Sequence, residues 1–372
     1  MADELRVGII GCGFIGSKRA RVIKEDQLAS LSCAADPVFP NAESLAREFA
    51  EGKAKAYQNW RIMLDEEKID AVIVATPNKF LKEITLRAVQ KDIHVLCEKP
   101  LGRNWFESFE MAEEAKKKKV ILKTGFNHRH HPAIRKAYEF VKAGDIGEVY
   151  YAKCVYGHGG RPGYEKEWRA SREICGGGEL LDQGVHVVDL FRWFLGDFEE
   201  AFGTISTYYW DMEVEDNAFA LFKTSKNQVA SMHTSWTQWK NRFNFEIFGE
   251  DGYLMIGGLG GSYGTETLRL GRRKKVESYR LSVDKESQPI AHQPITNNAG
   301  PKYAGGAPDE EVIEFPGPDI SWHEEWAEFT SAIREGREPL GNGQDGLEAN
   351  RMIEAVYRSA HENRPIKIQD MK

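Results

Sequence analysis

The sequence predicts an α/β protein with two domains: a doubly wound parallel sheet at the N-terminus, then an α+β domain with a large, open antiparallel sheet. Three observations favour this fold. Short apolar runs alternate with helix-length amphipathic segments as far as residue 126. A glycine-rich turn directly follows the first of these runs. Beyond residue 127, long runs of alternating residues replace that pattern.

The size of the chain agrees with two domains. Its 372 residues exceed the roughly 100 to 200 residues that one domain usually holds. We therefore expect a first domain over 1–126 and a second domain over 127–372. Hydrophobic residues make up 41% of the chain, with 19 Phe and 9 Trp, which is enough apolar surface for packed cores.

In the first domain, each strand candidate is a short apolar or β-branched run that is followed by a helix candidate. The strand candidates are 5–10, 31–35, 54–57, 69–75, 94–97 and 120–125. The helix candidates are 14–25, 41–51, 60–67, 79–91 and 104–118. Because helices connect the successive strands, we expect the strands to run parallel.

In the second domain, a helix over 133–143 ends at Gly144 and strands follow it. The strand candidates are 149–157, 203–210, 217–224, 228–239 and 242–249. Two helices at 322–335 and 345–362 close the chain. The segment 257–320 is rich in glycine and charge, and its pattern predicts no element.

Charge and composition limit the partners. A formal net charge of −7 argues against a nucleic-acid partner, because neutralising phosphates needs a basic face. The basic run 116–119 closes a helix candidate, where cations favour the negative end of the helix dipole, and the run 272–275 falls in an expected loop. No run approaches the roughly 18 apolar residues of a membrane span, so we expect no membrane partner.

Cysteine usage and the N-terminus indicate a reducing, cytoplasmic location. The five cysteines are odd in number, form no Cys-x-x-Cys pair and mostly lie in apolar runs, so we expect no disulfide framework. The chain begins Met-Ala-Asp-Glu and runs straight into a strand, without the basic and apolar regions of a signal peptide.

The glycine-rich turn is the first functional candidate. It joins the strand 5–10 to the helix 14–25 and reads Gly11-Cys12-Gly13-Phe14-Ile15-Gly16. In this context the first glycine permits the tight turn, the second lets the backbone approach a pyrophosphate, and the third allows close helix-strand packing. Backbone N–H groups at the helix start then face the phosphates. The turn predicts a dinucleotide site.

Two further positions refine the cofactor. Asp36 ends the second strand, 20 residues after Gly16, where a carboxylate accepts hydrogen bonds from ribose hydroxyls and disfavours a 2′-phosphate. We therefore predict NAD rather than NADP, although Asp36 before a proline could also serve as a turn initiator. Thr76-Pro77-Asn78 follows the strand 69–75 and can contact the cofactor, form a turn that caps the next helix, or do both.

Charged residues point to catalysis. Glu98-Lys99 ends a buried strand, where charge is costly unless it is used, although a simple ion pair of the two would also fit. The run 176–186 leads from three glycines, which would allow a substrate to approach, into an apolar helix. Asp182 and His186 are four residues apart, so we expect them on one helix face, with the carboxylate favouring the charged imidazole or orienting it. The alternative is a satisfied core histidine.

These motifs resemble those of the Gfo/Idh/MocA family, which includes glucose-fructose oxidoreductase and inositol dehydrogenase. The resemblance covers nearly the whole chain and rests on the glycine turn, on Glu98-Lys99-Pro100 and on the Gly-Gly-Gly-x-Leu-x-Asp-x-Gly-x-His run that ends at His186. It implies a Rossmann domain followed by an open, mostly antiparallel α/β domain, with substrate between the two. It also implies a homo-oligomer, a dimer or tetramer, because the sheet face of relatives often mediates oligomerisation.

The resemblance implies roles for individual residues. Lys99 and His186 would flank the reacting hydroxyl and the nicotinamide, and Asp182 would contact the substrate or the imidazole. Histidine, with an ordinary pKa of about 6.5, suits a general base, and an ammonium suits a developing alkoxide; Lys99 could itself be the base. Glu98 and Lys99 would also contact the cofactor.

Other candidates come from segments near these motifs. Trp168 and Arg169 would reach the nicotinamide or the substrate, Asn127 the cofactor, and Arg129 the substrate. His128, His130 and His131 lack Cys or carboxylate partners at ligand spacing, so we expect no metal. The segment before the three glycines offers polar side chains for a substrate, any of which could instead be an ordinary surface residue: Tyr156, His158, Arg161, Tyr164 and Arg172.

Together, these features predict an NAD-dependent oxidoreductase that converts a secondary ring hydroxyl of a sugar, a sugar derivative, including a nucleotide-linked one, or a cyclitol into a ketone. One alternative is an NAD-dependent glycosidase that works by transient oxidation and elimination. Another is a non-catalytic protein that senses NAD or sugar. The presence of Lys99, a position that is often altered in relatives with this glycosidase reaction, argues against the first alternative, and the presence of Lys99, Asp182 and His186 argues against the second.

Overall fold

The computed structural model describes residues 4–274 and 308–371. Its N-terminal sheet has six parallel strands in the order β3-β2-β1-β4-β5-β6. Their bounds are Leu5–Ile10 (β1), Ala29–Ala35 (β2), Lys55–Tyr57 (β3), Ala71–Val74 (β4), His94–Cys97 (β5) and Leu122–Thr124 (β6). All six predicted strands and their parallel arrangement are confirmed.

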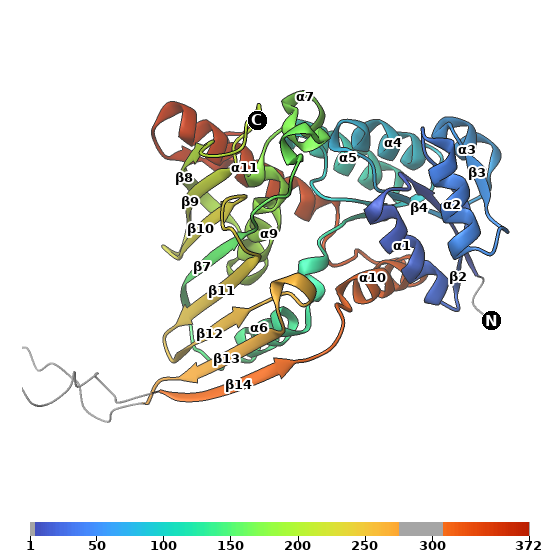
Figure 1. Cartoon of the computed structure of the whole chain (residues 1–372). Coiled ribbons are helices and arrows are strands. Elements are labelled where there is room, and N and C mark those ends of the chain that lie inside the picture. Colours follow the sequence, from blue (N-terminus) through green and yellow to red (C-terminus); the bar gives the residue numbers. More distant parts are fainter. Residues whose placement is uncertain (1–3, 275–307, 372) are drawn as a thin grey trace, which may run out of the picture.

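Helices cover both faces of this sheet (Figure 1). Their bounds are Phe14–Glu25 (α1), Phe39–Phe49 (α2), Trp60–Glu66 (α3), Asn78–Gln90 (α4) and Trp105–Lys118 (α5). Side chains of α3, α4 and α5 form one apolar core with the sheet, and side chains of α1 and α2 form another on the opposite face. The doubly wound fold therefore follows the predicted pattern.

A helix from near the end of the chain completes the second of these cores. Helix α10 (Ser321–Glu335) lies beside α1 in Figure 1. Its residues Trp326 and Phe329 are buried in the same cluster as Val7 and Ile9 of β1. The sequence position of this helix predicted that it belongs to the second domain. In the structure, however, its apolar face packs on the first domain.

The second sheet has nine strands in the order β14-β13-β12-β11-β7-β10-β9-β8-β15, and all neighbours are antiparallel except β7 and β10. The bounds are Val149–Gly157 (β7), Phe198–Ser206 (β8), Asn217–Thr224 (β9), Val229–Ser235 (β10), Arg242–Gly249 (β11), Gly252–Gly257 (β12), Glu266–Arg272 (β13), Asp309–Phe315 (β14) and Ile366–Lys367 (β15).

The sequence pattern predicted the central strands of this sheet but not the strands β12 to β14 on one side of it. β8 begins five residues before the predicted 203–210, and β10 ends before the predicted 228–239 does. β12, β13 and β14 had no predicted counterpart, because alternation there is interrupted by glycine and charge. Part of the unassigned segment, and Lys275 of the second basic run, lie outside the described residues, and Arg272 ends a strand rather than lying in a loop.

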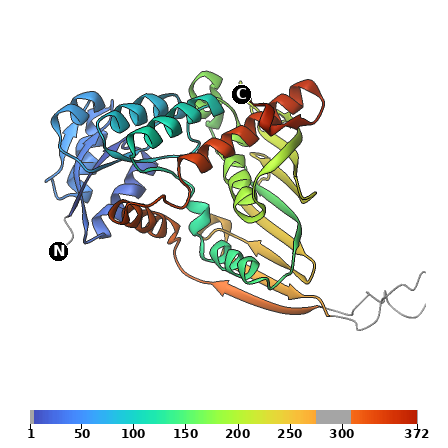
Figure 2. The same ribbon diagram turned by 180° about the vertical axis from the view of Figure 1, so that it is seen from behind.

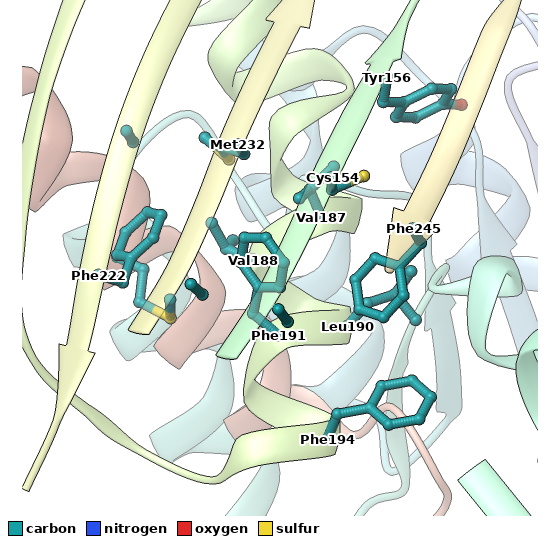
Figure 3. Close-up of a cluster of buried hydrophobic side chains, with 14 of the residues drawn as sticks. Cys154, Tyr156, Val187, Val188, Leu190, Phe191, Phe194, Phe222, Met232 and Phe245 are labelled. Carbon is teal, nitrogen blue, oxygen red and sulfur yellow. The ribbon is translucent and has the colours of Figure 1, made fainter. Parts of the chain in front are cut away.

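Helices α6 (Pro132–Ala143), α9 (Gly184–Leu195) and α11 (Gly343–Glu362) cover one face of the second sheet, as the two opposite views agree (Figures 1 and 2). Figure 3 shows apolar side chains of α9, such as Val188 and Phe191, against strand residues such as Phe222 and Phe245. The apolar run of α9 is therefore explained by the core of the second domain.

Short elements connect the two domains. They are a 3₁₀ helix at Asn127–His130 (η1), two more at Tyr164–Lys166 (η2) and Trp168–Ala170 (η3), and the short helices Arg172–Cys175 (α7) and Glu179–Asp182 (α8). All five cysteines are buried and free. Among the described residues, no helix is both long and apolar enough to cross a membrane.

Candidate active site

Two glycines of the turn after β1 are required by packing. Gly11 has φ +94°, and a Cβ there would lie 2.4 Å from the carbonyl oxygen of Ala75. A Cβ on Gly16 would lie 2.1 Å from the carbonyl oxygen of Gly11. These contacts bring α1 against the sheet at the carboxyl end of β1, which agrees with the roles predicted for the first and third glycines.

The remaining glycine leaves room at the start of α1. A Cβ on Gly13 would meet no atom within 4 Å. No side chain caps the helix, its first turn holds no acidic residue, and Phe14 is 76% exposed while Ile15 is half-buried. The backbone N–H groups and the positive end of the helix dipole therefore face open space, and this site fits a pyrophosphate.

Asp36 combines the two roles that the sequence allowed. One carboxylate oxygen accepts a hydrogen bond from the backbone N–H of Cys12, at 2.9 Å. The other accepts from the Val38 N–H at 2.9 Å and from the Asn41 amide at 3.2 Å. The residue thus orders its own turn and holds the glycine turn beside it. Because a carboxylate can accept about four hydrogen bonds, capacity remains for a ribose hydroxyl.

The segment after β4 also faces this region. The Thr76 hydroxyl is buried and has no hydrogen-bond partner within the described chain, which suits a contact with a bound cofactor. Pro77 occupies the N-cap position of α4, so the expected Asn78 cap is wrong. The Asn78 amide instead donates to the Cys175 carbonyl oxygen at 2.8 Å, so this side chain joins the two domains.

Glu98 and Lys99 do not pair with each other. Glu98 accepts from Arg19 at 2.7 Å, and Arg19 also contacts Glu325 of α10 at 2.7 Å. Arg19 and Glu325 are buried, and Glu98 is nearly so. This cluster joins α1, the end of β5 and α10 around the cofactor turn. The contact of Glu98 with the cofactor itself stays a prediction.

Lys99 and Asp182 form the central contact between the domains. The Lys99 Nζ donates to the Asp182 carboxylate at 2.7 Å and to the Asp182 carbonyl oxygen at 2.6 Å. The two side chains are 19% and 20% exposed. Burial alone would raise the pKa of Asp182, but the charges of Lys99 and Arg169 outweigh it and hold that pKa well below its ordinary value. Asp182 is therefore an anion at neutral pH.

His186 lies on a different helix from Asp182. The helix is interrupted at Gln183, so Asp182 is the last residue of α8 and His186 belongs to α9. The prediction that the two share one helix face is therefore wrong. The His186 ring stacks on the His128 ring with centroids 3.8 Å apart. Burial and the nearby Lys99 charge hold the pKa of His186 well below its ordinary value, so the imidazole is neutral and not charged as one expectation had it.

Sequence reasoning missed the role of His128. Its Nε2 lies 3.1 Å from the Tyr156 hydroxyl, and its Nδ1 lies 3.2 Å from the Asn127 amide oxygen. His128 thus packs on the candidate base His186 and links it to β7. Its place between Asn127 and Arg129 was the available signal, but neither spacing nor periodicity distinguishes a ring that stacks from one that binds a metal.

Arg129 is not placed for substrate binding. The guanidinium donates to Asp189 at 2.8 and 2.5 Å and to Asp345 at 3.1 Å, and the side chain is buried. With these contacts, Arg129 joins η1 to α9 and α11. The expectation is corrected for a physical reason, because three charge-assisted hydrogen bonds leave this guanidinium little capacity for a ligand.

Trp168 and Arg169 come close to the Lys99–Asp182 pair. The Arg169 Nε donates to the second Asp182 carboxylate oxygen at 3.3 Å, and its guanidinium lies over the Trp168 ring at 4.4 Å. Asp182 therefore receives a cation from each domain. Arg169 therefore lies at the pair with Trp168 packed on its guanidinium, and the contact of either residue with a cofactor or substrate stays a prediction.

The other substrate candidates separate into two groups. Tyr156, His158 and Tyr164 lie within electrostatic reach of Asp182, and burial lowers the pKa of His158 to about 4. In contrast, Arg161 is exposed and pairs with Glu167 at 2.6 Å. The Arg172 guanidinium donates to the Glu213 carbonyl oxygen at 2.8 Å. Within the first group the Tyr156 and Tyr164 side chains are buried, at 5% and 2% exposed, whereas His158 is half-buried, so His158 is the best placed for a substrate.

The three glycines before α8 serve packing rather than substrate approach. A Cβ on Gly176, which has φ +88°, would lie 2.6 Å from Arg103 atoms. On Gly177 it would lie 2.1 Å from the Tyr357 hydroxyl, and on Gly178 it would lie 2.0 Å from the Glu215 carbonyl oxygen. Protein atoms therefore occupy the space in which a substrate was expected.

The histidine cluster of η1 is engaged by protein groups. The His131 Nδ1 lies 2.7 Å from a Glu266 carboxylate oxygen. Across residues 4–274 and 308–371, no group of three or more His, Cys, Asp or Glu side chains could hold a metal ion. The described part of the site therefore offers no metal centre.

Two family models match this chain, one for each domain. The model described as "Oxidoreductase family, NAD-binding Rossmann fold" matches residues 5–126, and the GFO/IDH/MocA C-terminal domain matches residues 134–255. The solved structure of levoglucosan dehydrogenase in complex with NADH shares the fold, with a TM-score of 0.82 at 22% identity over 98% of this chain and 99% of that chain.

Curated relatives cover most of the chain. Levoglucosan dehydrogenase from Pseudarthrobacter phenanthrenivorans is 26% identical over 68% of this chain and 74% of that protein. Myo-inositol 2-dehydrogenase from Thermotoga maritima is 26% identical over 99% of each. The 2,7-anhydro-N-acetylneuraminate hydratase from Mediterraneibacter gnavus is 24% identical over 98% of this chain and 96% of that protein.

Proposed function

The chain belongs to the Gfo/Idh/MocA family of oxidoreductases, and on that premise we propose that it oxidises a secondary ring hydroxyl of a sugar, sugar derivative or cyclitol to a ketone, with NAD. One observation carries the proposal. An ammonium from the NAD-binding domain, Lys99, meets a carboxylate from the second domain, Asp182, at 2.7 Å. Names of full-length relatives that include a myo-inositol dehydrogenase support the substrate class.

The cofactor would be held by the carboxyl edge of the first sheet. The open space at Gly13 and the start of α1 would take the pyrophosphate, and Asp36 the ribose. Thr76, with its unpaired hydroxyl, would contact the cofactor further along. When bound, NAD supplies a hydride acceptor at nicotinamide C4. The Lys99 side chain would then lie between cofactor and substrate.

Lys99 is suited to hold the reacting hydroxyl. An ammonium has three N–H donors, and Asp182 accepts two of them. The third is available for the substrate oxygen, where positive charge stabilises a developing alkoxide. Asp182 fixes the direction of that donor and is itself held by Arg169. The pair therefore presents an oriented cation at the junction of the domains.

The proton balance needs one base. Oxidation would remove a hydride from the ring carbon, for which bound NAD would be the acceptor, and would release the hydroxyl proton to a side chain as the C=O bond forms. His186 is neutral, and its Nδ1 is buried without a hydrogen-bond partner among the described residues, so it has a free site for that proton, although burial and the Lys99 charge, which lower its pKa, oppose protonation. Lys99 is the alternative acceptor, and the variants described below distinguish the two.

The decisive experiment follows NADH formation by absorbance against a panel of sugars, inositols and nucleotide sugars. We expect turnover with a ring polyol and a keto product by mass spectrometry. Binding of NAD without turnover of any panel member would contradict the dehydrogenase and favour a sensor.

A second candidate function is an NAD-dependent glycosidase or hydratase, and the full-length hydratase relative supports it. In this reaction the ring hydroxyl would be oxidised only transiently, the leaving group would be eliminated, water would add to the resulting double bond, and reduction of the ketone would restore the cofactor. The same experiment separates the two reactions. Release of a free sugar from a glycoside or anhydro sugar, without net NADH, would favour this candidate over the dehydrogenase.

We also propose that the protein is a homo-oligomer through the uncovered face of its second sheet. Large apolar side chains on neighbouring strands are exposed there, namely Tyr151, Phe202, Phe219 and Leu221. Light scattering should give a dimer or tetramer, and Phe219→Lys with Leu221→Lys should dissociate it. Phe80→Lys, on exposed α4, is the control. A monomeric wild type would contradict this proposal.

A further inference from the structure

Helix α11 contacts α8, which carries Asp182, and it also contacts the segment that follows Lys99. Two of its polar residues, Asn350 and Tyr357, are seven positions apart. Because an α-helix has 3.6 residues per turn, they lie two turns apart on one face. Each makes hydrogen bonds toward a different member of the pair, although neither touches the pair itself.

Asn350 holds the segment that follows Lys99. Its amide nitrogen donates to the carbonyl oxygen of Leu101 at 3.0 Å and contacts the Ser108 hydroxyl at 2.6 Å. Leu101 is two residues beyond Lys99, and Asn350 is only 1% exposed. Removal of this amide would leave a buried carbonyl oxygen with one donor fewer, at the point where the backbone leaves the catalytic lysine.

Tyr357 holds the helix that carries Asp182, through Glu215. The Tyr357 hydroxyl donates to a Glu215 carboxylate oxygen at 2.7 Å. The same oxygen accepts the backbone N–H groups of Gly178, at 3.0 Å, and Leu180, at 3.2 Å. These N–H groups belong to the start of α8, and Asp182 is its last residue. The buried Glu215 carboxylate thus anchors this short helix.

We infer that Asn350 and Tyr357 of α11, together with Glu215 from the segment before β9, are positioning residues that hold Lys99 and Asp182 in contact across the domain boundary. The inference rests on the proposed function for the catalytic role of that pair. It also explains the glycines at 177 and 178, because a Cβ at either position would collide with Tyr357 or Glu215. Tyr357 and Glu215 can approach this closely only because residues 177 and 178 are glycines and have no Cβ.

Packing does not substitute for these hydrogen bonds. A pocket of about 280 Å³ lies on the same face of α11 and is lined by both Asn350 and Tyr357. Arg103 from the first domain and Leu181 of α8 line its other walls. Side chains beside such a space can rotate once their hydrogen bonds are lost, so the catalytic pair would lose its support rather than settle into a new contact.

The first test needs no turnover. Acetic anhydride modifies accessible amines, and mass spectrometry reports the rate at Lys99, with the exposed Lys53 as internal standard. We expect Glu215→Ala and Asn350→Leu to raise the Lys99 rate about tenfold, and Tyr357→Phe about threefold, because the amine loses its paired carboxylate. Glu215→Gln keeps an acceptor oxygen and should restore a rate close to that of the wild type.

A matched control removes the same kind of bond elsewhere. Tyr253 also donates its hydroxyl to a glutamate, Glu310, on β12 and β14 far from the site. Tyr253→Phe should leave Lys99 labelling unchanged. A wild-type rate in both Glu215→Ala and Asn350→Leu would overturn the inference, as would an equal rise in Tyr253→Phe. If Glu215→Ala does not fold, Tyr357→Phe and Asn350→Leu decide the question.

Kinetics separates positioning from general damage. Tyr357→Phe should lower kcat about fivefold and change the KM for NAD less than twofold, because the pyrophosphate turn is untouched. In a Lys99→Met background it should have no further effect on kcat, and an equal fivefold loss there would overturn the inference. If labelling changes as expected but no ring alcohol is turned over, the proposed function fails and the inference stands.

Discussion

Each side chain of the Lys99–Asp182 pair comes from a different domain, so the site exists only in the assembled molecule. Lys99→Met should lower kcat by about 10²- to 10⁴-fold, because the alkoxide loses its charge partner. NAD affinity, measured by fluorescence titration, should change little. Lys53→Met, at an exposed position, is the control. Activity close to wild type would remove Lys99 from the mechanism.

The proton acceptor is decided by a second variant. His186→Ala should also lower kcat about 10²-fold or more if the imidazole takes the hydroxyl proton. Its effect on NAD affinity should be small, since the ring lies against His128 and not at the pyrophosphate turn. If His186→Ala retains half of the wild-type kcat, Lys99 is the base.

We expect Asp36 to determine the preference for NAD over NADP. Asp36→Ala should weaken NAD binding about tenfold and bring the affinities for NAD and NADP closer together, because the carboxylate no longer favours the ribose hydroxyls over a 2′-phosphate. Titration with both cofactors measures this. Asp70→Ala is the control, since that carboxylate bonds Arg6 at the opposite end of β1. Unchanged discrimination in Asp36→Ala would contradict the assignment.

Part of the site could be predicted residue by residue. Gly11, Asp36 and Lys99 stand directly after strands, and parallel strands bring their carboxyl ends to one edge, so spacing alone predicts their neighbourhood. The contact of Arg129 with Asp189 and the stacking of His128 on His186 could not be predicted. Both depend on side-chain directions in the 3₁₀ helix η1, which has four residues and is therefore too short for its three-residue period to leave a pattern in the sequence.

Among the elements, the start of α1 and the segment before α8 use glycine for opposite reasons. Gly13→Ala adds a methyl group to open space, so the melting temperature should stay within a few degrees while NAD binding weakens about tenfold or more. Gly178→Ala would place a methyl 2.0 Å from the Glu215 carbonyl oxygen and should destabilise the fold by at least about 2 kcal/mol. Thermal unfolding and NAD titration of both variants test this, and equal loss of stability in the two would contradict it.

Helices and buried strands were predictable because their periodicity is strong over many residues. The strands β12 to β14 on one side of the second sheet were not, since β12 and β13 are short and bounded or interrupted by glycine, and β14 is mostly exposed and acidic. The four-residue spacing of Asp182 and His186 also misled the prediction of a shared face. A glycine-containing segment can break a helix between two residues, and Gln183 marks that break here.

For the whole molecule, buried neutral histidines link stability to pH. Burial lowers the pKa of His128, His130 and His186 in the folded state. Below the unfolded pKa of about 6.5, the unfolded chain therefore binds protons that the folded chain does not. Each histidine contributes stability that is present above pH 6.5 and is lost as pH falls toward its folded pKa, by about 1 kcal/mol at pH 5.5.

His130→Gln isolates this effect, because buried Glu179, whose pKa is raised, responds to pH in the opposite sense. Urea unfolding of wild type and variant at pH 7.5 and 5.5 gives the change in the free energy of unfolding with pH for each protein. The wild type should lose about 1 kcal/mol more than the variant over this interval. Parallel slopes would show that His130 titrates equally in both states.

The packing of α10 on the first sheet also has a consequence for biosynthesis. Trp326 and Phe329 complete the core that β1 and α1 begin. On the ribosome, the NAD-binding domain is synthesised first, yet the face of its sheet that α1 and α2 cover stays only partly covered until about 200 further residues have been added. That domain therefore reaches its final packing only when nearly the whole polypeptide has emerged, and a nascent chain that stops after β6 exposes apolar surface for chaperones to bind.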